Sequence, residues 1–186
     1  MRTYDPSQVD PVVLTTMFFG KLIRQVHELH THQVAHGAIS KSNIVVNDMG
    51  ELELGDFSHC YAVKMNNNNT LCEEMKQVPS KHIQHHPAEV EWFLADRLPF
   101  YHPLKADIWY LGSVLMEMVY VLMPTPHRDA ERREFPERGD TKFKKLLARM
   151  LSPDPSKRPD THELMQLLDS PIFFDKDKVE MCKEYV

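Results

Sequence analysis

The sequence predicts a mainly α-helical domain that carries a short β-hairpin. The strongest evidence is the stretch from Ala106 to Met123, ADIWYLGSVLMEMVYVLM, which is apolar on nearly every side. A helix that is hydrophobic all round belongs in a protein core or in a membrane. About 18 residues at ~1.5 Å each span ~27 Å, which is marginal for a bilayer, and Glu117 lies inside the stretch. We therefore expect a buried central helix.

The composition is that of a soluble globular protein. The chain has 186 residues, of which 42% are hydrophobic and 26% charged, enough for one domain with a full core. The formal net charge of −5 argues against general nucleic-acid binding, and no membrane segment is expected. Cys60, Cys72 and Cys182 form an odd, scattered set, which indicates a reducing compartment, hence an intracellular location, cytoplasmic or nuclear.

The first expected element is an amphipathic helix from Val12 to Gln33, preceded by an extended lead-in over residues 1–11. Its expected apolar face consists of Leu14, Phe18, Leu22, Val26 and Leu29. Three histidines, His27, His30 and His32, lie in its last turns. Polar or cationic groups suit the carboxyl end of a helix, so we expect these side chains to be solvated.

A hairpin is expected next. The β runs Ile44–Val46 and Leu52–Leu54 flank Asn47-Asp48-Met49-Gly50, a turn of the expected composition. The segment from Ser58 to Pro87 is long and irregular, and such a loop in a compact domain is usually functional. Shorter helices are expected over residues 88–98, 141–151 and 161–169, followed by a charged tail over residues 175–186.

The order of the motifs is more specific than any one of them. A loop from His36 to Asn43 precedes the hairpin, and the pair Asp56-Phe57 follows it. Further along stand Pro87-Ala88-Glu89, then Asp107-x-Trp109-x-x-Gly112, then Asp154-Pro155-Ser156-Lys157-Arg158-Pro159. In type, order and spacing these motifs resemble the large, carboxyl-terminal lobe of a protein kinase of the serine/threonine type, over roughly residues 12–174. Because about ten residues precede the first helix, the resemblance implies a kinase-like lobe without the amino-terminal lobe.

The catalytic loop departs from the family pattern. The family reads His-Arg-Asp-Leu-x-x-x-x-Asn, and here His36 is followed by Gly37 and Ala38, with Ser40 where a lysine is common. The methyl group of Ala38 cannot accept a proton or orient a hydroxyl, and loss of a positioned general base costs ~10²–10⁴ in rate. The resemblance therefore implies a pseudokinase, a protein that is not an enzyme.

The two positions that hold magnesium in the family agree with the family pattern more closely than the catalytic loop does. Asn43 and Asp56 match the family's two magnesium ligands, although Ser58 replaces the glycine of the Asp-Phe-Gly signature and restricts the backbone there. A carboxylate that accepts backbone hydrogen bonds in a tight loop is the favoured role for Asp56. We expect no cofactor, with weak binding of Mg-ATP at this pair as the alternative.

The positions with a structural role are retained. Glu89 and Arg158 match a buried ion pair of the family, and Asp107 matches the acid that holds the backbone of the catalytic loop. His36 and Phe57 match an internal hydrophobic column.

A zinc site is an alternative interpretation of some of the remaining histidines and cysteines. It would combine His82, His85 and His86 with Cys60 or Cys72, but their spacing fits no standard structural motif.

The favoured function is a binding module that acts as a scaffold, a regulator or an inhibitory mimic of a true kinase. Its partner would be a protein, such as a kinase or a kinase substrate, or a second copy of the chain, bound at a surface that includes Val45 and Phe57. Neither nucleic acid nor a membrane is expected as a partner. One alternative is a nucleotide-binding or phosphotransfer enzyme that uses Asn43 and Asp56 with the missing lobe supplied elsewhere. Another is a fragment of a longer pseudokinase.

Overall fold

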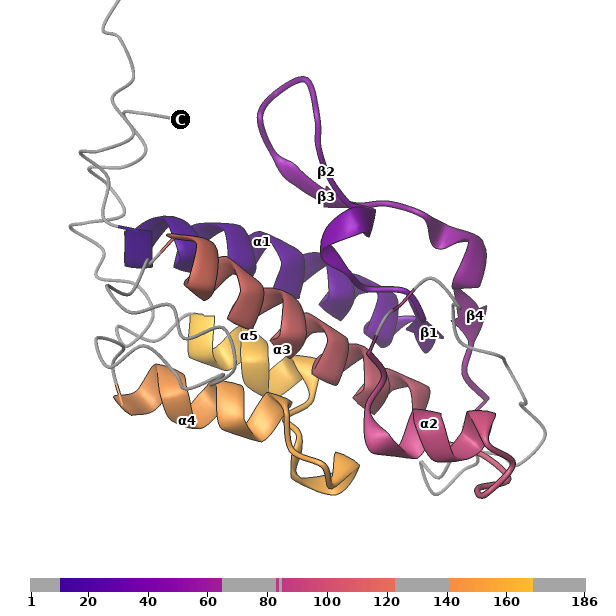
Figure 1. The fold of residues 1–186 in the computed structure, drawn as a ribbon. Coiled ribbons are helices and arrows are strands. Elements are labelled where there is room, and N and C mark those ends of the chain that lie inside the picture. Colours follow the sequence, from indigo (N-terminus) through magenta and orange to yellow (C-terminus); the bar gives the residue numbers. More distant parts are fainter. Residues whose placement is uncertain (1–10, 65–82, 84, 123–140, 169–186) are drawn as a thin grey trace, which may run out of the picture.

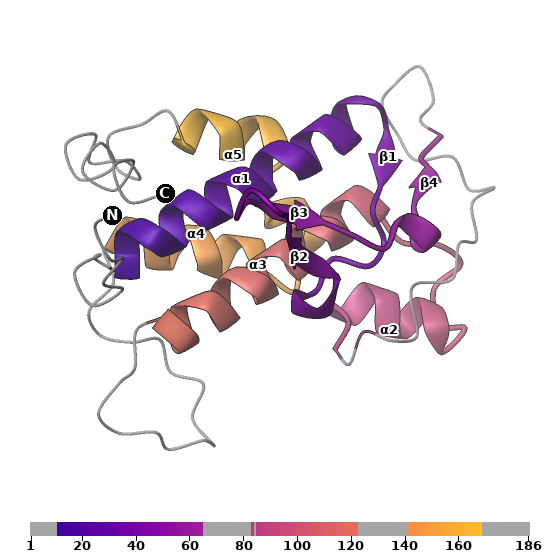
Figure 2. The same ribbon diagram turned by 90° about the horizontal axis from the view of Figure 1, so that it is seen from above.

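The computed structural model describes residues 11–64, 83, 85–122 and 141–168. Two long helices, α1 (Pro11–Thr31) and α3 (Pro103–Leu122), lie side by side at its centre (Figures 1 and 2). Helix α5 (Thr161–Leu168) packs against α1, and α4 (Thr141–Met150) packs against α3. The expected lead-in before Pro11 and the expected tail over residues 175–186 lie outside the described residues, as does most of the segment from Ser58 to Pro87.

The central helix is buried, as its composition predicts. It starts three residues before the expected Ala106, at Pro103, where the missing amide proton costs no helical hydrogen bond. The side chains of its fully buried positions form the middle of the core: Ile108, Leu111, Val114, Leu115 and Val119. In the described part of the chain, no helix combines the length and the apolar character that a membrane crossing requires.

The apolar face of α1 differs from the predicted one. The buried residues in the described part of α1 are Thr15, Phe19, Gly20, Leu22, Ile23, Val26 and His30. Phe18 and Leu29 are only half-buried, and the side chain of Leu14 lies outside the described residues. Because α1 packs against both α3 and α5, the stripe it buries is wider and rotated relative to a stripe that faces one partner. The predicted solvation of His30 is wrong for the same reason: this side chain points into the interface with α3.

The hairpin is confirmed. Strands β2 (Ile44–Val46) and β3 (Leu52–Leu54) pair antiparallel, with Val45 opposite Glu53. In the turn, the Asn47 side-chain oxygen accepts hydrogen bonds from the amides of Met49 and Glu51, at 3.0 and 2.9 Å. The hairpin projects from the helical layer (Figure 1).

A second small sheet has no counterpart in the sequence prediction. Strands β1 (Val34–Ala35) and β4 (Tyr61–Ala62) pair antiparallel, and the Val63 amide donates to Gln33 O at 2.6 Å. Two-residue strands are too short to show an alternating pattern. This sheet joins the end of α1 to the segment after Asp56 and thereby brings the two candidate site loops together.

The remaining elements agree with the prediction apart from their ends. Helix α2 (Ala88–Leu94) ends four residues before the predicted Leu98. The amides of Arg97 and Leu98 both donate hydrogen bonds to the Trp92 carbonyl, which ends the helical pattern. A 3₁₀ turn at Pro155–Lys157 connects α4 to α5.

Candidate functional site

The loop from His36 to Asn43 is held by one buried carboxylate of α3. Asp107 Oδ2 accepts from the His36 amide at 2.7 Å, and Asp107 Oδ1 accepts from the Gly37 amide at 3.0 Å. The His30 imidazole lies 3.1 Å from the same Oδ2, and Asp107 is fully buried. A buried carboxylate must be paired or hydrogen-bonded to remain charged, and these three donors meet that need. The loop is therefore fixed to the central helix.

Glycine at position 37 fits this loop for a structural reason. Gly37 has φ of +72°, and a Cβ atom on it would lie 2.7 Å from the His59 carbonyl oxygen. Any side chain at this position would combine backbone strain with a steric clash. Glycine in place of the family's arginine is therefore consistent with the close approach of the segment that contains His59.

Ala38 is completely buried, and both its backbone amide and its backbone carbonyl make hydrogen bonds to neighbouring residues. Its amide donates to His36 Nδ1 at 3.3 Å, and its carbonyl accepts from Asn43 Nδ2 at 2.8 Å. The backbone geometry of the loop is therefore kept, while the methyl side chain offers neither a donor nor an acceptor.

The structure brings Asn43 and Asp56 together. The Gly55 amide donates to Asn43 O at 2.7 Å, which places Asp56 directly beside the end of the loop. Asp56 has φ of 56° and is exposed, and its Oδ1 accepts from the amide and the hydroxyl of Ser58, at 3.4 and 2.5 Å. These hydrogen bonds hold the pKa of the Asp56 carboxyl below its usual range. An amide oxygen and an ionised carboxylate are hard oxygen ligands, so the pair fits Mg²⁺ chemically.

His36 and Phe57 lie next to each other, with their ring centroids 5.2 Å apart. His36 is fully buried, whereas Phe57 is 54% exposed. Burial lowers the pKa of His36, so the imidazole is neutral at pH 7. The internal hydrophobic column that the sequence predicts is therefore buried at His36 and exposed to solvent at Phe57.

The ion pair expected between Glu89 and Arg158 is present. Arg158 Nη2 donates to Glu89 Oε2 at 2.9 Å, and Nη1 donates to the other carboxylate oxygen. The same guanidinium also donates to the carbonyls of Ser152 and Lys105, at 2.9 and 3.0 Å. Only 2% of Arg158 is exposed. The pair ties the start of α2 to the turn before α5.

An exposed apolar surface, which we call the hairpin face, is formed by Val45, Val46 and Phe57. They are 48%, 66% and 54% exposed. A Cβ atom on Gly55 would lie 3.6 Å from Val45 Cγ1, so Val45 and the segment leading to Phe57 adjoin. Neighbouring residues of a strand point to opposite sides, so Val45 and Val46 are exposed on different sides of β2, and Val45 is the one that adjoins the segment leading to Phe57.

The histidines of the rival zinc site do not gather in the described part of the chain. No group of three or more histidine, cysteine or acidic side chains that could hold a metal occurs there, and His82 and Cys72 lie outside it. His86 Nδ1 lies 2.7 Å from the Tyr110 hydroxyl. Burial raises the pKa of the Cys60 thiol to about 11, which disfavours the thiolate that zinc binds.

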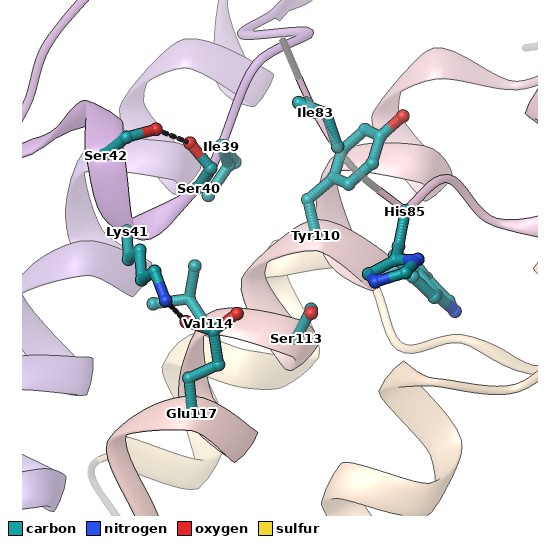
Figure 3. Close-up of a pocket in the computed structure, with 11 residues that line it drawn as sticks. Ile39, Ser40, Lys41, Ser42, Ile83, His85, Tyr110, Ser113, Val114 and Glu117 are labelled. Atoms are coloured by element: carbon teal, nitrogen blue, oxygen red, sulfur yellow. Dashed lines mark hydrogen bonds and ion pairs between the residues drawn. The ribbon is translucent and has the colours of Figure 1, made fainter. Parts of the chain in front are cut away.

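Sequence reasoning missed one feature of the site. A hollow lies between the loop at residues 39–42 and α3, and an ion pair between Lys41 and Glu117 spans it (Figure 3). The two residues are far apart in sequence, and no local pattern joins them.

Comparison with known proteins decides the family. A family model described as the protein kinase domain matches residues 11–168. The chain belongs to the protein kinase family. Similar proteins include the mitogen-activated protein kinase kinase kinase MST11 of Pyricularia oryzae, 26% identical over 167 residues, which cover 83% of this chain and 18% of the relative. The serine/threonine-protein kinase Aurora-1 of Arabidopsis thaliana is 26% identical over 160 residues, 80% of this chain and 49% of the relative. CBL-interacting protein kinase 29 of rice is 27% identical over 161 residues, 82% and 33% of the two chains.

These comparisons confirm the predicted kinase superfamily and correct the prediction that the protein is not an enzyme. The family and its named members are kinases, so the comparisons point to an enzyme. The prediction rests on the missing carboxylate at Ala38 and on the expected absence of an amino-terminal lobe. In phosphoryl transfer, however, catalysis is almost entirely positioning and electrostatic stabilisation, and a general base accounts for only part of the rate. The chain spans from about a fifth to a half of the length of these relatives.

Proposed function

We propose that this kinase-family lobe serves as a protein-binding module, a scaffold or regulator, whose partner covers the hairpin face. The observation that carries the proposal is the exposure of Val45, Val46 and Phe57 beside a tightly fixed loop. Each large apolar side chain left in water forgoes ~1.5–3 kcal/mol of burial energy. Val45 adjoins the segment that leads to Phe57, and contiguous apolar patches on soluble proteins generally mark interaction sites.

The rigidity of the surroundings supports this role. The loop beneath the hairpin face is anchored by the buried Asp107, and the turn of the hairpin is closed by Asn47. A surface that is ordered before binding loses less conformational entropy when a partner docks. The hairpin face therefore meets the physical requirements of a docking surface.

The partner that fits best is the small lobe of a protein kinase. By family resemblance, that lobe covers the hairpin and the loop that carries Phe57. Such a lobe would come either from a longer protein that includes this chain or from a separate kinase. The scattered cysteines support an intracellular setting for this interaction.

A pair of matched variants tests the proposal. Val45→Asp puts a charge on the hairpin face, whereas Leu94→Asp makes the same kind of change at a similarly exposed position, 43%, on α2. We expect Val45→Asp to weaken binding to a purified kinase small lobe at least tenfold, measured by titration calorimetry, and Leu94→Asp to leave it unchanged. Equal affinity of wild type and both variants would refute the proposal. Concentration-dependent dimerisation that only Val45→Asp abolishes would instead identify a second copy as the partner.

A second candidate function is Mg-nucleotide binding and phosphoryl transfer through Asn43 and Asp56. The favouring observation is the hydrogen bond from the Gly55 amide to the Asn43 carbonyl, which brings the backbones of Asn43 and Asp56 close together. When bound, magnesium would neutralise charge on the phosphates; Asn43 and Asp56 would hold it and set its position.

Thermal unfolding tests this second function. A ligand at a hundred times its dissociation constant stabilises the fold by ~2.7 kcal/mol, which gives a rise in Tm of several degrees. If the pair holds the metal, millimolar Mg-ATP will raise the Tm of wild type and of the control Asp48→Ala, which changes an exposed acid of the hairpin turn, but not of Asp56→Ala. No rise in wild type would remove this candidate.

A further inference from the structure

The two edges of the hairpin differ. Gln25 of α1 lies against the outer edge of β3, where its Nε2 donates to Leu52 O and its Oε1 accepts from the Leu54 amide, both at 2.8 Å. The side-chain amide thus makes with β3 the two hydrogen bonds that the backbone of an adjacent strand would make. The outer edge of β3 is therefore already occupied by a side chain of the same chain.

The hydrogen bonds of the hairpin fix which backbone groups of β2 point outwards. The Asn47 amide donates to Glu51 O at 2.9 Å, and the Gly55 amide donates to Asn43 O at 2.7 Å. The backbone groups of Asn43 and Asn47 are therefore directed towards the β3 side. Because this direction alternates along a strand of an antiparallel pair, Val46 directs both its amide and its carbonyl away from β3.

This outer edge of β2 is open. The Ile44 amide donates to Lys41 O, but the Ile44 carbonyl and both backbone groups of Val46 have no protein partner in the part of the chain that the structure describes. Val46 is 66% exposed, and the hairpin projects from the helical layer (Figure 1). The strand consists of three β-branched residues, which favour β structure, and it lacks the charge or proline that commonly protects an edge. The edge is therefore suited to pairing with another strand.

The charges that flank β2 indicate which strand fits this edge. Lys41, whose side chain is 79% exposed, precedes β2, and the exposed Asp48 follows it. When two copies of β2 lie antiparallel, Lys41 of each copy lies at the end where Asp48 of the other copy is found, whereas parallel pairing would bring like charges together. The exposed contact of Lys41 with Glu117, at 3.3 Å, contributes little to stability and can open. A second copy of the chain is thus complementary to this edge in its backbone and in its charges.

We propose that two copies of the chain pair antiparallel through the outer edges of β2, about a twofold axis at Val46. The Val46 amide of each copy donates to the Val46 carbonyl of the other. Because β2 has three residues, few hydrogen bonds form and the association is weak and reversible. Because Gln25 occupies the opposite edge, pairing stops at two copies, whereas a hairpin with two open edges could add copies without limit. The inference goes beyond the partner proposed above for the hairpin face and does not rest on it.

The variant Val46→Pro tests the backbone contact. Proline removes the outward amide proton, is tolerated on edge strands and leaves the hydrogen bonds between β2 and β3 in place. Val46→Thr is the matched control, because it keeps both the amide and the branched shape. We expect sedimentation equilibrium to show a monomer–dimer equilibrium for wild type and Val46→Thr with similar dissociation constants. The constant of Val46→Pro should be about five- to a hundredfold higher, the range for two lost hydrogen bonds.

A charge exchange provides a second test that does not depend on how Val46→Pro folds. Asp48→Lys places lysines opposite each other at both ends of the paired strands and should raise the dissociation constant of the dimer about two- to thirtyfold. Lys41→Asp combined with Asp48→Lys restores opposite charges and should return the constant to the wild-type value. Glu91→Lys is the control: it makes the same change in net charge at an exposed position on α2 and should leave dimerisation unchanged.

Four results would overturn the proposal. The first is a wild-type chain that stays monomeric up to its solubility limit, and the second is a wild-type chain that forms species larger than a dimer. The third is an equal dissociation constant for a folded Val46→Pro and for Val46→Thr. The fourth is a failure of the charge exchange to restore dimerisation, or an effect of Glu91→Lys as large as that of Asp48→Lys. If circular dichroism shows that Val46→Pro does not fold, the charge exchange alone decides.

Discussion

Replacement of Arg158 by alanine should destabilise the fold strongly. The guanidinium makes hydrogen bonds to both oxygens of Glu89 and to the carbonyls of Ser152 and Lys105, and its side chain is wholly buried. Removal of one partner of a buried pair leaves an uncompensated charge and costs ~3–5 kcal/mol. For a domain of this size that corresponds to a fall in Tm of about 6–20 °C.

A second ion pair of the same residue types provides the control. Arg149 also binds a glutamate, Glu163, through both of its terminal nitrogens, but these side chains are 47% and 39% exposed. Because an exposed pair contributes ~0–1 kcal/mol, Arg149→Ala should cost about 1 kcal/mol or less. Burial, and not the chemistry of the pair, separates the two expectations.

Urea unfolding followed by circular dichroism measures both variants. If Arg158→Ala is too unstable to purify, Arg158→Lys keeps the charge, loses the planar fork and should show a smaller, measurable loss. The double variant Glu89→Ala/Arg158→Ala should be less destabilised than the sum of the single variants, because neither charge is left alone. Equal losses for Arg158→Ala and Arg149→Ala would refute the reasoning.

Two further predictions concern the loop that contains His36. Gly37→Ala combines left-handed strain with a clash against the His59 carbonyl. It should cost about 1–3 kcal/mol more than Gly50→Ala, which has φ of +77° and open space around it; equal losses in urea unfolding would exclude the clash. His36 has its pKa lowered by burial, so its contribution to stability is complete above the unfolded pKa of about 6.5 and is lost as the pH falls. As the pH is lowered from 7.5 to 5.5, the free energy of unfolding of wild type should decrease, by up to ~1.4 kcal/mol per pH unit below pH 6.5. The decrease should be less steep in His36→Asn. Identical slopes in wild type and variant would contradict this role of His36.

The helices and the hairpin could be predicted from the sequence because their signals are local. The apolar stretch that became α3 and the Asn47–Gly50 turn contain the needed information within a few residues. The pairing of Glu89 with Arg158, 69 residues apart, was accessible only through the family resemblance.

Other features depend on contacts between distant segments. His30 looks like a solvated residue at the end of a helix, and only the packing of α1 on α3 places it against Asp107. The pairing of β1 with β4 spans residues that carry no strand pattern. The contact between Lys41 and Glu117 likewise arises from the way the loop lies across α3, which no periodicity encodes.

The most direct test of the hairpin face as a docking surface is site-specific photo-crosslinking in the native cell. A photoreactive phenylalanine analogue would replace Val46, which is 66% exposed on the hairpin, or Leu94, which is 43% exposed on α2. The account predicts that the probe at Val46 crosslinks to a kinase small lobe identified by mass spectrometry, and that Val45→Asp in the same chain removes this product while the probe at Leu94 never gives it. A probe at Val46 that yields no crosslinked product, or the same products as the probe at Leu94, would contradict the account.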